Sequence, residues 1–423
     1  MYCGSCMRDN NLAAELIAQG HDVILLPLYT PTRTDEPNVS QPRVFFGGIS
    51  IYLEQKLGLF RWTPKFLDRL WDRPSVINAF AGRGVEVAPA QLGAMTVSML
   101  EGRDGRQRKE VDNLVRWLRS EPAPDVVTLP YTLLIALAKP IKQAIGRPVI
   151  CTLQGEELFL EGLPEPYKSR SLDLIRRQIN EVDAFIAVSH YEGRFMANYF
   201  GIPPSKIHTV PLGISLQGHG PATAKPDVFT IGYLARIAPE KGLHLFAEAY
   251  IEFRKRSPPA RLQAAGYLAP ENRKYLASVE ERLRQAGMIE EFKYWGEVDR
   301  DAKIRFLQQL HVFSLPATYD EPKGIPVIEA MANGIPVVQP RRGAFPELVE
   351  ATGGGLLVDP DSPVALADAW RSLRDDPALA SELGSKGAAA VPAQFSLVTM
   401  ARRALEVYGR QSAVLAGIAA GHN

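Results

Sequence analysis

The chain has 423 residues, of which 46% are hydrophobic and 22% are charged, a composition typical of a globular protein with two or three domains. Its formal net charge of +1 gives no general attraction to nucleic acid, so we expect no nucleic-acid partner. No apolar run has the length of a membrane-spanning helix, and the first residues show no basic-then-apolar leader pattern. Three cysteines fit a reducing compartment better than a disulfide framework, so we expect a cytoplasmic protein.

The first 29 residues predict a glycine-containing loop, a helix over residues 10–19 and a strand over residues 22–29. Cys3 and Cys6 form a C-x-x-C pair near the start of this helix, a position that favours thiolates. Only Cys151 remains elsewhere, so a four-cysteine zinc site is impossible without histidine. We interpret the pair as small residues lining a ligand-facing loop, with redox or metal chemistry as the alternative.

Residues 30–120 form the least regular part of the sequence. Aromatic and basic residues mix in the segment KLGLFRWTPKFLDRLW, residues 56–71. Three interpretations remain open for it: buried core, a platform for an acceptor, or an amphipathic patch on the inner face of a membrane. Residues 103–119 predict a charged helix with a solvated face.

Apolar runs then alternate with helical patterns. The runs at residues 125–131, 148–153, 184–189 and 207–211 predict the parallel strands of βαβ units. A polar turn follows the second run, at the edge where open parallel sheets bind ligands. In this turn Glu156 and Glu157 either contact an acceptor or are simply solvated.

A second alternating set lies beyond residues 216–227, LQGHGPATAKPD, which predict a linker because they are rich in glycine, proline and alanine. The predicted strands of this set are residues 229–234, 262–266, 292–296, 312–315, 335–338 and 356–358. We therefore expect an α/β protein with two Rossmann-like domains, residues 1–215 and 228–395. A final helix is predicted over residues 397–408, within the C-terminal segment 396–423.

The most informative stretch is residues 318–338, TYDEPKGIPVIEAMANGIPVV, between two of these strands. A proline suits the first turn of a short helix there, and a glycine suits its end. Glu321 then lies in the strand-to-helix loop, and Glu329 lies about one turn into the helix and leans back toward the loop. Both carboxylates can face one pocket at the sheet edge, where the N–H groups of Gly324 and Ile325 would favour an anion. The alternative is a helix whose glutamates only favour the dipole and face solvent.

This pattern resembles the E-x7-E signature of retaining glycosyltransferases with the GT-B fold, and of glycosyltransferase family 4 in particular. The segments EPKGIPVIEAMANGIPVV, GAFPELVE and GLLVDPD match that family almost position by position, and the resemblance covers nearly the whole chain. It implies two Rossmann-like domains facing a cleft, with the final helix crossing back to the first domain. It also implies transfer of a hexose, with retention of configuration, from a nucleotide-diphosphate-sugar donor to an acceptor that the sequence does not identify.

The resemblance further implies a catalytic set of Arg236, Lys241 and Glu321. Arg236 and Lys241, in ARIAPEKG, would hold the donor diphosphate, where fixed cations stabilise the charge that grows on the leaving group. The alternative is a surface salt bridge, for example with Glu240. Glu321 would lie near the hydroxyls of the donor sugar, and Glu329 would accept hydrogen bonds from the ribose. The other residues expected at the donor are Gly296 and Val298 beside the base, and Lys323, Gly324 and Ile325 beside the phosphate or sugar.

On the acceptor side, the family's glycine loop approaches the acceptor or the donor phosphates. Gly4 matches it best, and Arg8 is expected to contact an anion. Gln154 stands where the family often has histidine, and is expected to contact substrate in its place. The family usually opens with a strand before the glycine loop, and no such strand precedes the loop here. We therefore expect either a gap in the first sheet or an upstream start.

Two D-x-D strings, residues 299–301 and 359–361, resemble the metal motif of GT-A enzymes. Each precedes a predicted helix, so we interpret them as helix caps and expect neither a metal nor a separate cofactor. Two other functions remain open: a GT-B sugar-nucleotide epimerase, which would need an acid/base pair in the cleft, and an inactive nucleotide-sugar-binding protein.

Overall fold

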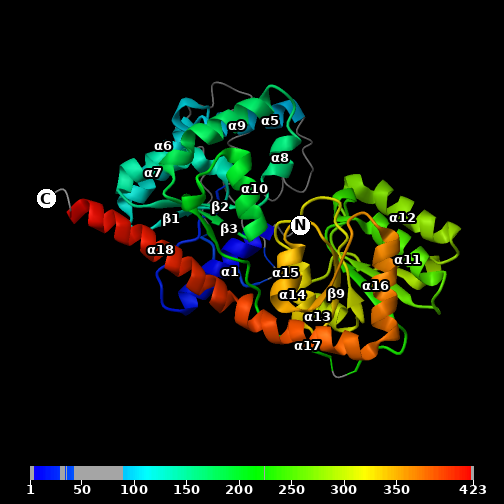
Figure 1. Cartoon of the computed structure of the whole chain (residues 1–423). Coiled ribbons are helices and arrows are strands. Elements are labelled where there is room, and N and C mark those ends of the chain that lie inside the picture. The colour runs from blue at the N-terminus through cyan, green and yellow to red at the C-terminus, as the bar shows by residue number, and fades with distance from the viewer. Residues whose placement is uncertain (1–3, 29–33, 35, 42–88, 223, 421–423) are drawn as a thin grey trace. The chain divides into compact units, whose positions relative to one another are not determined.

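A computed structural model of the protein describes residues 4–28, 34, 36–41, 89–222 and 224–420. These residues form two compact units, which Figure 1 colours along the chain from blue to red. The first unit holds the described residues up to Val210 and those from Ala401 onward, and the second unit holds Pro211–Met400. Each unit is built around one parallel sheet.

The first unit contains the four strands that the sequence predicts between residues 125 and 211. They lie in the order β1-β2-β3-β4, and Ile150 of β2 pairs with Ala184 of β3. β2 and β3 are buried along their whole length, as expected for parallel strands covered on both faces. The strands are β1 (Val127–Leu129), β2 (Val149–Leu153), β3 (Ala184–Ala187) and β4 (Ile207–Thr209). The helices are α1 (Gly4–Ala18), α5 (Pro89–Leu100), η2 (Gly102–Asp104), α6 (Arg108–Ser120), η3 (Thr132–Leu137), α7 (Ala138–Ile145), α8 (Glu157–Glu161), α9 (Tyr167–Gln178), η4 (Ile179–Glu181), α10 (His190–Phe200) and η5 (Pro204–Lys206).

The second unit contains the six predicted strands of the second set. They lie in the order β10-β9-β8-β5-β6-β7, all parallel. The strands are β5 (Thr230–Leu234), β6 (Arg261–Ala265), β7 (Phe292–Tyr294), β8 (Val312–Phe313), β9 (Val337–Pro340) and β10 (Gly355–Val358). The helices are η6 (Pro239–Lys241), α11 (Leu243–Arg254), η7 (Pro270–Asn272), α12 (Arg273–Gln285), η8 (Ile289–Glu291), α13 (Arg300–Gln308), α14 (Ile325–Ala332), α15 (Phe345–Thr352), α16 (Pro363–Asp375) and α17 (Pro377–Gln394).

The predicted final helix is α18 (Leu397–Ala420), which begins in the second unit and continues into the first. Its residues from Ala401 onward belong to the first unit, where the hydroxyl of Ser412 donates to the carbonyl of Asp125 at 3.3 Å. The expected return of this helix to the first domain is therefore confirmed.

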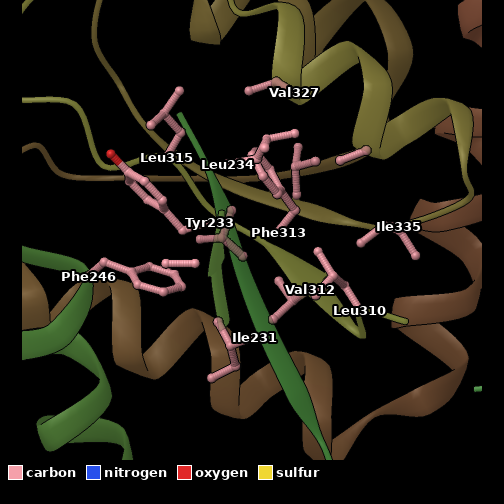
Figure 2. Close-up of a cluster of buried hydrophobic side chains, with 14 of the residues drawn as sticks. Ile231, Tyr233, Leu234, Phe246, Leu310, Val312, Phe313, Leu315, Val327 and Ile335 are labelled. Atoms are coloured by element: carbon pink, nitrogen blue, oxygen red, sulfur yellow. The ribbon is translucent and has the colours of Figure 1, made fainter. Parts of the chain in front are cut away.

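The core of the second unit is centred on β5 and β8, which Figure 2 shows with their apolar side chains. Ile231 and Tyr233 of β5 are fully buried beside Phe246 of α11. The ring of Trp370 on α16 packs edge-on against Phe246, with the ring centres 5.4 Å apart. Its Nε1–H donates to the hydroxyl of Ser314 at 2.9 Å, so burying this indole leaves its polar group paired.

Two predictions for the first residues are wrong. α1 begins at Gly4 and not at residue 10, so the expected glycine loop is helical from Gly4 onward. Residues 22–28 are not a strand. Ile24 is 48% exposed, and Gln41 donates its N–H to the carbonyl of Leu25 at 2.8 Å without a ladder forming. A strand needs a neighbour that pairs along its length, which an apolar pattern alone cannot supply.

The interpretations placed on Cys3 and on residues 56–71 lie outside the described residues. Across the part of the chain that the structure describes, no helix has both the length and the apolar character needed to cross a bilayer.

Replacing Trp370 with alanine should destabilise the second unit by about 3–5 kcal/mol, because it leaves a large cavity beside Phe246. The matched control is Val364→Ala in the same helix, where the side chain is 54% exposed and little packing is lost. Scanning calorimetry of both variants gives the comparison. Equal melting temperatures for the two variants would show that this core does not depend on the indole.

Candidate active site

Two loops meet at the carboxyl ends of the neighbouring strands β5 and β8. Residues 235–242 connect β5 to α11, and residues 314–324 connect β8 to α14. The N–H of Thr318 donates to the carbonyl of Glu240 at 2.9 Å, which ties the loops together. Gly242 has a φ of +76°, and a Cβ there would lie 1.8 Å from the carbonyl oxygen of Pro316. A glycine is therefore required for the two loops to approach this closely.

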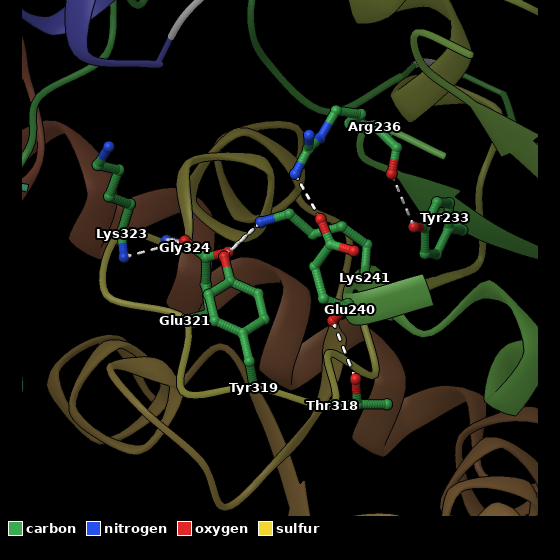
Figure 3. Close-up of polar contacts among 9 residues, drawn as sticks. All are labelled: Tyr233, Arg236, Glu240, Lys241, Thr318, Tyr319, Glu321, Lys323 and Gly324. Atoms are coloured by element: carbon green, nitrogen blue, oxygen red, sulfur yellow. Dashed lines mark hydrogen bonds and ion pairs between the residues drawn. The ribbon is translucent and has the colours of Figure 1, made fainter. Parts of the chain in front are cut away.

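Lys241, in the first loop, is held by two side chains of the second loop. Its Nζ lies 2.5 Å from Oε2 of Glu321 and 2.5 Å from the hydroxyl of Tyr319. That hydroxyl in turn donates to Glu321, and the Lys241 Nζ lies 4.6 Å from the centre of the Tyr319 ring. Figure 3 shows the ammonium directed at both partners. The three groups form one closed network at the edge of the sheet.

Glu321 is buried yet ionised. Burial alone would raise the pKa of its carboxyl, but the charge of Lys241 and hydrogen bonds from Lys241 and Tyr319 lower the pKa from 4.5 to about 2. Its other oxygen, Oε1, accepts from the backbone N–H groups of Lys323 at 3.1 Å and Gly324 at 3.4 Å. Glu321 is therefore a fixed negative charge that orients the ammonium of Lys241.

A second close contact fixes the backbone of Glu321. A Cβ at Gly343, where φ is +56°, would lie 2.5 Å from the backbone nitrogen and oxygen of Glu321. The N–H of Ala344 donates to that same oxygen at 2.8 Å. The predicted start of the helix is confirmed, since Gly324 caps α14 and Ile325 begins it. The N–H of Gly324, expected to favour an anion, donates to the carboxylate of Glu321 at 3.4 Å, because that side chain folds back over its own turn.

Arg236 lies in the same loop as Lys241. Its guanidinium is 2.5 Å from Oε1 of Glu240, which is the salt bridge that the alternative interpretation predicted. The Arg236 side chain is 42% exposed, and exposed pairs of this kind are typically worth less than about 1 kcal/mol. The guanidinium can therefore exchange its partner for another anion at small cost.

Glu329 lies one turn into α14, as predicted. Its Oε1 is 2.6 Å from Nζ of Lys303 on α13, and the two side chains are only 7% and 12% exposed. The alternative in which both glutamates face solvent is therefore wrong, because Glu321 and Glu329 each form a buried ion pair with a lysine.

The end of β7 presents an aromatic surface next to the predicted base loop. The carbonyl of Gly296 accepts from the N–H of Gly266 at 2.8 Å, and Val298 packs partly buried against the core. The ring of Trp295 is 39% exposed, and Nζ of Lys293 lies 3.5 Å from its centre. A flat apolar ring of this kind suits a nucleotide base.

In the first unit, predicted residues gather near the carboxyl end of β2. Gly4 is the first residue of α1, and Arg8 lies one turn further along. The Arg8 side chain is buried, and its Nη1 donates to the hydroxyl of Thr152 in β2 at 3.2 Å. The structure therefore brings α1 and β2 together at the edge where the sequence predicts an acceptor site.

Glu156 is not solvated as the simplest interpretation predicted. It is 7% exposed, and its two oxygens accept from the backbone N–H groups of Thr132 at 2.9 Å and Gln154 at 2.8 Å. The Nε2 of Gln154 donates to the carbonyl of Pro130 at 2.8 Å. The carboxylate therefore joins the loops that follow β1 and β2, because buried backbone N–H groups require an acceptor.

Only the first of the two D-x-D strings provides a helix cap. Asp299 caps α13 by accepting from the N–H of Ala302 at 2.8 Å, as predicted. The cap of α16 is Ser362, so the prediction for residues 359–361 is wrong. Asp361 instead pairs with Arg342 at 2.6 Å, because its backbone, with a φ of +55°, turns away from the helix start. Within the described residues, no three His, Cys, Asp or Glu side chains gather closely enough to hold a metal ion.

Two residues of these buried clusters were not predicted from the sequence: Tyr319, which hydrogen-bonds to Lys241, and Lys303, which pairs with Glu329. A signal exists only for Tyr319, which lies two residues before Glu321 in a loop already expected to carry the site. Lys303 is on another helix, so its partner cannot be read from spacing.

Glu321→Gln should destabilise the protein in a pH-dependent way. Because the pKa of this carboxyl falls from 4.5 to about 2 on folding, its contribution is fully present above pH 4.5 and is lost as the pH falls toward 2. The difference is on the order of 3 kcal/mol at neutral pH. The gap in melting temperature between wild type and Glu321→Gln should therefore be wider at pH 7 than at pH 3. Glu382→Gln, at an exposed pair with Lys386, is the control. An equal gap for Glu321→Gln at both pH values would contradict the assignment.

Comparison with known families places both units in one group. The pattern of Glycosyl transferases group 1 matches residues 220–390, and that of Glycosyltransferase Family 4 matches residues 94–217. The α-maltose-1-phosphate synthase of Mycolicibacterium smegmatis is 31% identical over 261 residues, which are 56% of this chain and 66% of that protein. A GDP-mannose-dependent monoacylated α-(1-6)-phosphatidylinositol monomannoside mannosyltransferase of Corynebacterium glutamicum is 27% identical over 288 residues, 64% of this chain and 72% of that protein.

Solved structures agree on the fold. HepE of Anabaena in complex with UDP has a TM-score of 0.63 at 18% identity, covering 73% of this chain and 84% of that chain. Sucrose-phosphate synthase of Thermosynechococcus elongatus has a TM-score of 0.62 at 20% identity, covering 73% and 79%. The chain thus belongs to the Glycosyl transferases group 1 and Glycosyltransferase Family 4 proteins, has the GT-B fold, and is a retaining glycosyltransferase that uses a nucleotide-sugar donor.

Proposed function

We propose that the loops after β5 and β8 bind the diphosphate of the donor, with Lys241 as the central cation and Arg236 beside it. The closed network of Lys241, Glu321 and Tyr319 is the observation that carries this proposal. It holds the ammonium in one position before the substrate arrives. A preorganised cation stabilises the charge on a leaving group without the cost of reorienting during the reaction.

In the proposed reaction, the bond between the anomeric carbon and the diphosphate oxygen breaks as the acceptor hydroxyl attacks from the same face. The leaving phosphate takes the proton of that hydroxyl, and Lys241 and Arg236 offset the negative charge that appears. Glu321 forms no covalent intermediate in this scheme, because its carboxylate already accepts hydrogen bonds at both oxygens. Its role is to hold Lys241 and to lie near the hydroxyls of the donor sugar.

The remainder of the donor site follows from the other predicted residues of the second unit. Glu329, fixed by Lys303, accepts from the ribose hydroxyls, and the surface around Trp295 packs against the base. The other proposed donor contacts are Gly296, Val298, Lys323, Gly324 and Ile325. The first unit, joined through the linker at residues 216–227, binds the acceptor with Gly4, Arg8 and Gln154, while Glu156 holds Gln154 in place.

The names of the relatives reduce the number of plausible donors and acceptors. Several are named for GDP-mannose, and the HepE structures contain UDP or UDP-glucose, so we propose a hexose donor carried by GDP or UDP. The relatives are named as transferases or synthases, which favours transfer over the epimerase and binding-protein alternatives. Four are named for phosphatidylinositol monomannosides, so we include the cytoplasmic face of a membrane among the proposed sites of action.

A melting-temperature series with UDP, GDP, ADP and dTDP tests the donor assignment. GDP or UDP should stabilise the wild-type protein by roughly 2.7 kcal/mol at 100 times its Kd. Lys241→Met should strongly reduce this shift and abolish glycosyl transfer, because the diphosphate loses its central cation. Lys255→Met, at an exposed lysine that follows the last residue of α11, is the matched control and should behave as wild type. An unchanged shift and rate in Lys241→Met would remove Lys241 from the site.

Substitutions of Glu329 and Glu321 should have different effects on calorimetric titrations with the preferred nucleoside diphosphate. Glu329→Gln should weaken binding about tenfold, since the ribose loses a charged acceptor. Glu321→Gln should lower turnover far more than it lowers this affinity. The reverse order of affinity losses would exchange the two roles.

A further inference from the structure

The guanidinium of Arg8 is buried, and the described residues pair with only part of it. The side chain is only 4% exposed, and its Nη1 is engaged by Oδ1 of Asp9 at 2.6 Å and by the hydroxyl of Thr152 at 3.2 Å. Its Nε and Nη2 are buried and have no hydrogen-bond partner among the described residues. A buried donor that bears part of a positive charge and lacks an acceptor is strongly unfavourable. Such an arrangement persists only when something else compensates for it.

The two unpaired atoms lie on the same edge of the guanidinium. The N–H bonds of Nε and Nη2 point in parallel along this edge, the geometry in which arginine binds the two oxygens of a carboxylate or phosphate. Among the described residues, the contacts to this guanidinium are made on the opposite side, through Nη1. The edge formed by Nε and Nη2 can therefore bind a ligand through two parallel hydrogen bonds.

The surroundings of Arg8 are those of a ligand site. It lies near the N-terminal end of α1, whose dipole favours an anion, and Thr152 lies near the carboxyl end of β2. Just beyond β2, Oε1 of Gln154 is also buried without a donor among the described residues. Both oxygens of nearby Glu156 already accept backbone N–H groups, so this carboxylate does not need Arg8 as a partner.

We propose that Arg8 recognises an anionic group, a phosphate or a carboxylate, on the acceptor, through a side-on pair of hydrogen bonds from Nε and Nη2. Gln154 then accepts a hydrogen bond from a hydroxyl of the same molecule through Oε1. The acceptor of this glycosyltransferase is thus an acidic molecule. The inference rests on the proposed function, in which the first unit binds the acceptor and the second unit binds the donor.

Inorganic phosphate is the probe, titrated calorimetrically at constant ionic strength into the full chain saturated with its preferred nucleoside diphosphate. Saturation fills the proposed donor site, so phosphate reports only on a second anion site. Wild type should bind phosphate under these conditions. Arg8→Gln and Arg8→Lys should each weaken this binding about tenfold or more, since neither offers the paired N–H edge. Arg116→Gln, the same change at an exposed arginine of α6, should leave it unchanged.

Arg8→Lys keeps a positive charge beside Asp9, so it protects the test against a variant that fails to fold, and unchanged melting temperatures verify this. Phosphate binding that survives in a folded Arg8 variant overturns the proposal, as does a wild type that binds no phosphate. If the nucleotide abolishes phosphate binding and Arg8→Gln weakens nucleotide binding, the anion is the donor diphosphate and the acceptor assignment fails. Failure of the proposed function would give a different result from these outcomes, because no nucleotide would then raise the melting temperature of the chain.

Discussion

The ion pair between Lys241 and Glu321 is the interaction on which the rest of the second unit's site depends. Neither charge is stable in this position alone, because each is largely withdrawn from water and removing one partner leaves the other buried and unpaired. Lys241 and Tyr319 both donate hydrogen bonds to the carboxylate of Glu321. These bonds and the charge of Lys241 are the reason for the low pKa of Glu321. The pair also constrains the backbone. Two glycines, Gly242 and Gly343, allow the loops to approach closely enough for the side chains to meet.

The fold could be predicted from the sequence where the signals are local. The unbroken apolar strands, the proline and glycine around α14, and the placement of Glu321 and Glu329 all follow from periodicity and capping. The failures share another cause, since each depends on a contact made elsewhere in the chain. No described strand pairs with residues 22–28, and Glu156 is buried because loops after two different strands use its oxygens. Lys303 reaches Glu329 from a separate helix, which no spacing rule encodes.

The three basic residues of the proposed sites differ in how far they are buried and in how the protein pairs their charge. Lys241 is satisfied by a carboxylate and a phenol, so its charge is held in place by the protein. Arg236 is exposed and weakly paired, so it can change partner. Arg8 is buried, and within the described part of the chain only its Nη1 is paired, so the proposal gives its other edge to a ligand. A chain of almost neutral net charge can thus bind anionic substrates, because recognition depends on a few placed cations and not on the overall field.

In the proposed donor site, Lys241 is a preorganised cation for the diphosphate. The most direct measurement compares the affinity of the preferred nucleoside diphosphate with that of its monophosphate, by calorimetry, in wild type and in Lys241→Met. We expect wild type to bind the diphosphate more tightly and Lys241→Met to lose most of that preference while still binding the nucleoside. An equal preference for the diphosphate in both proteins would contradict this account.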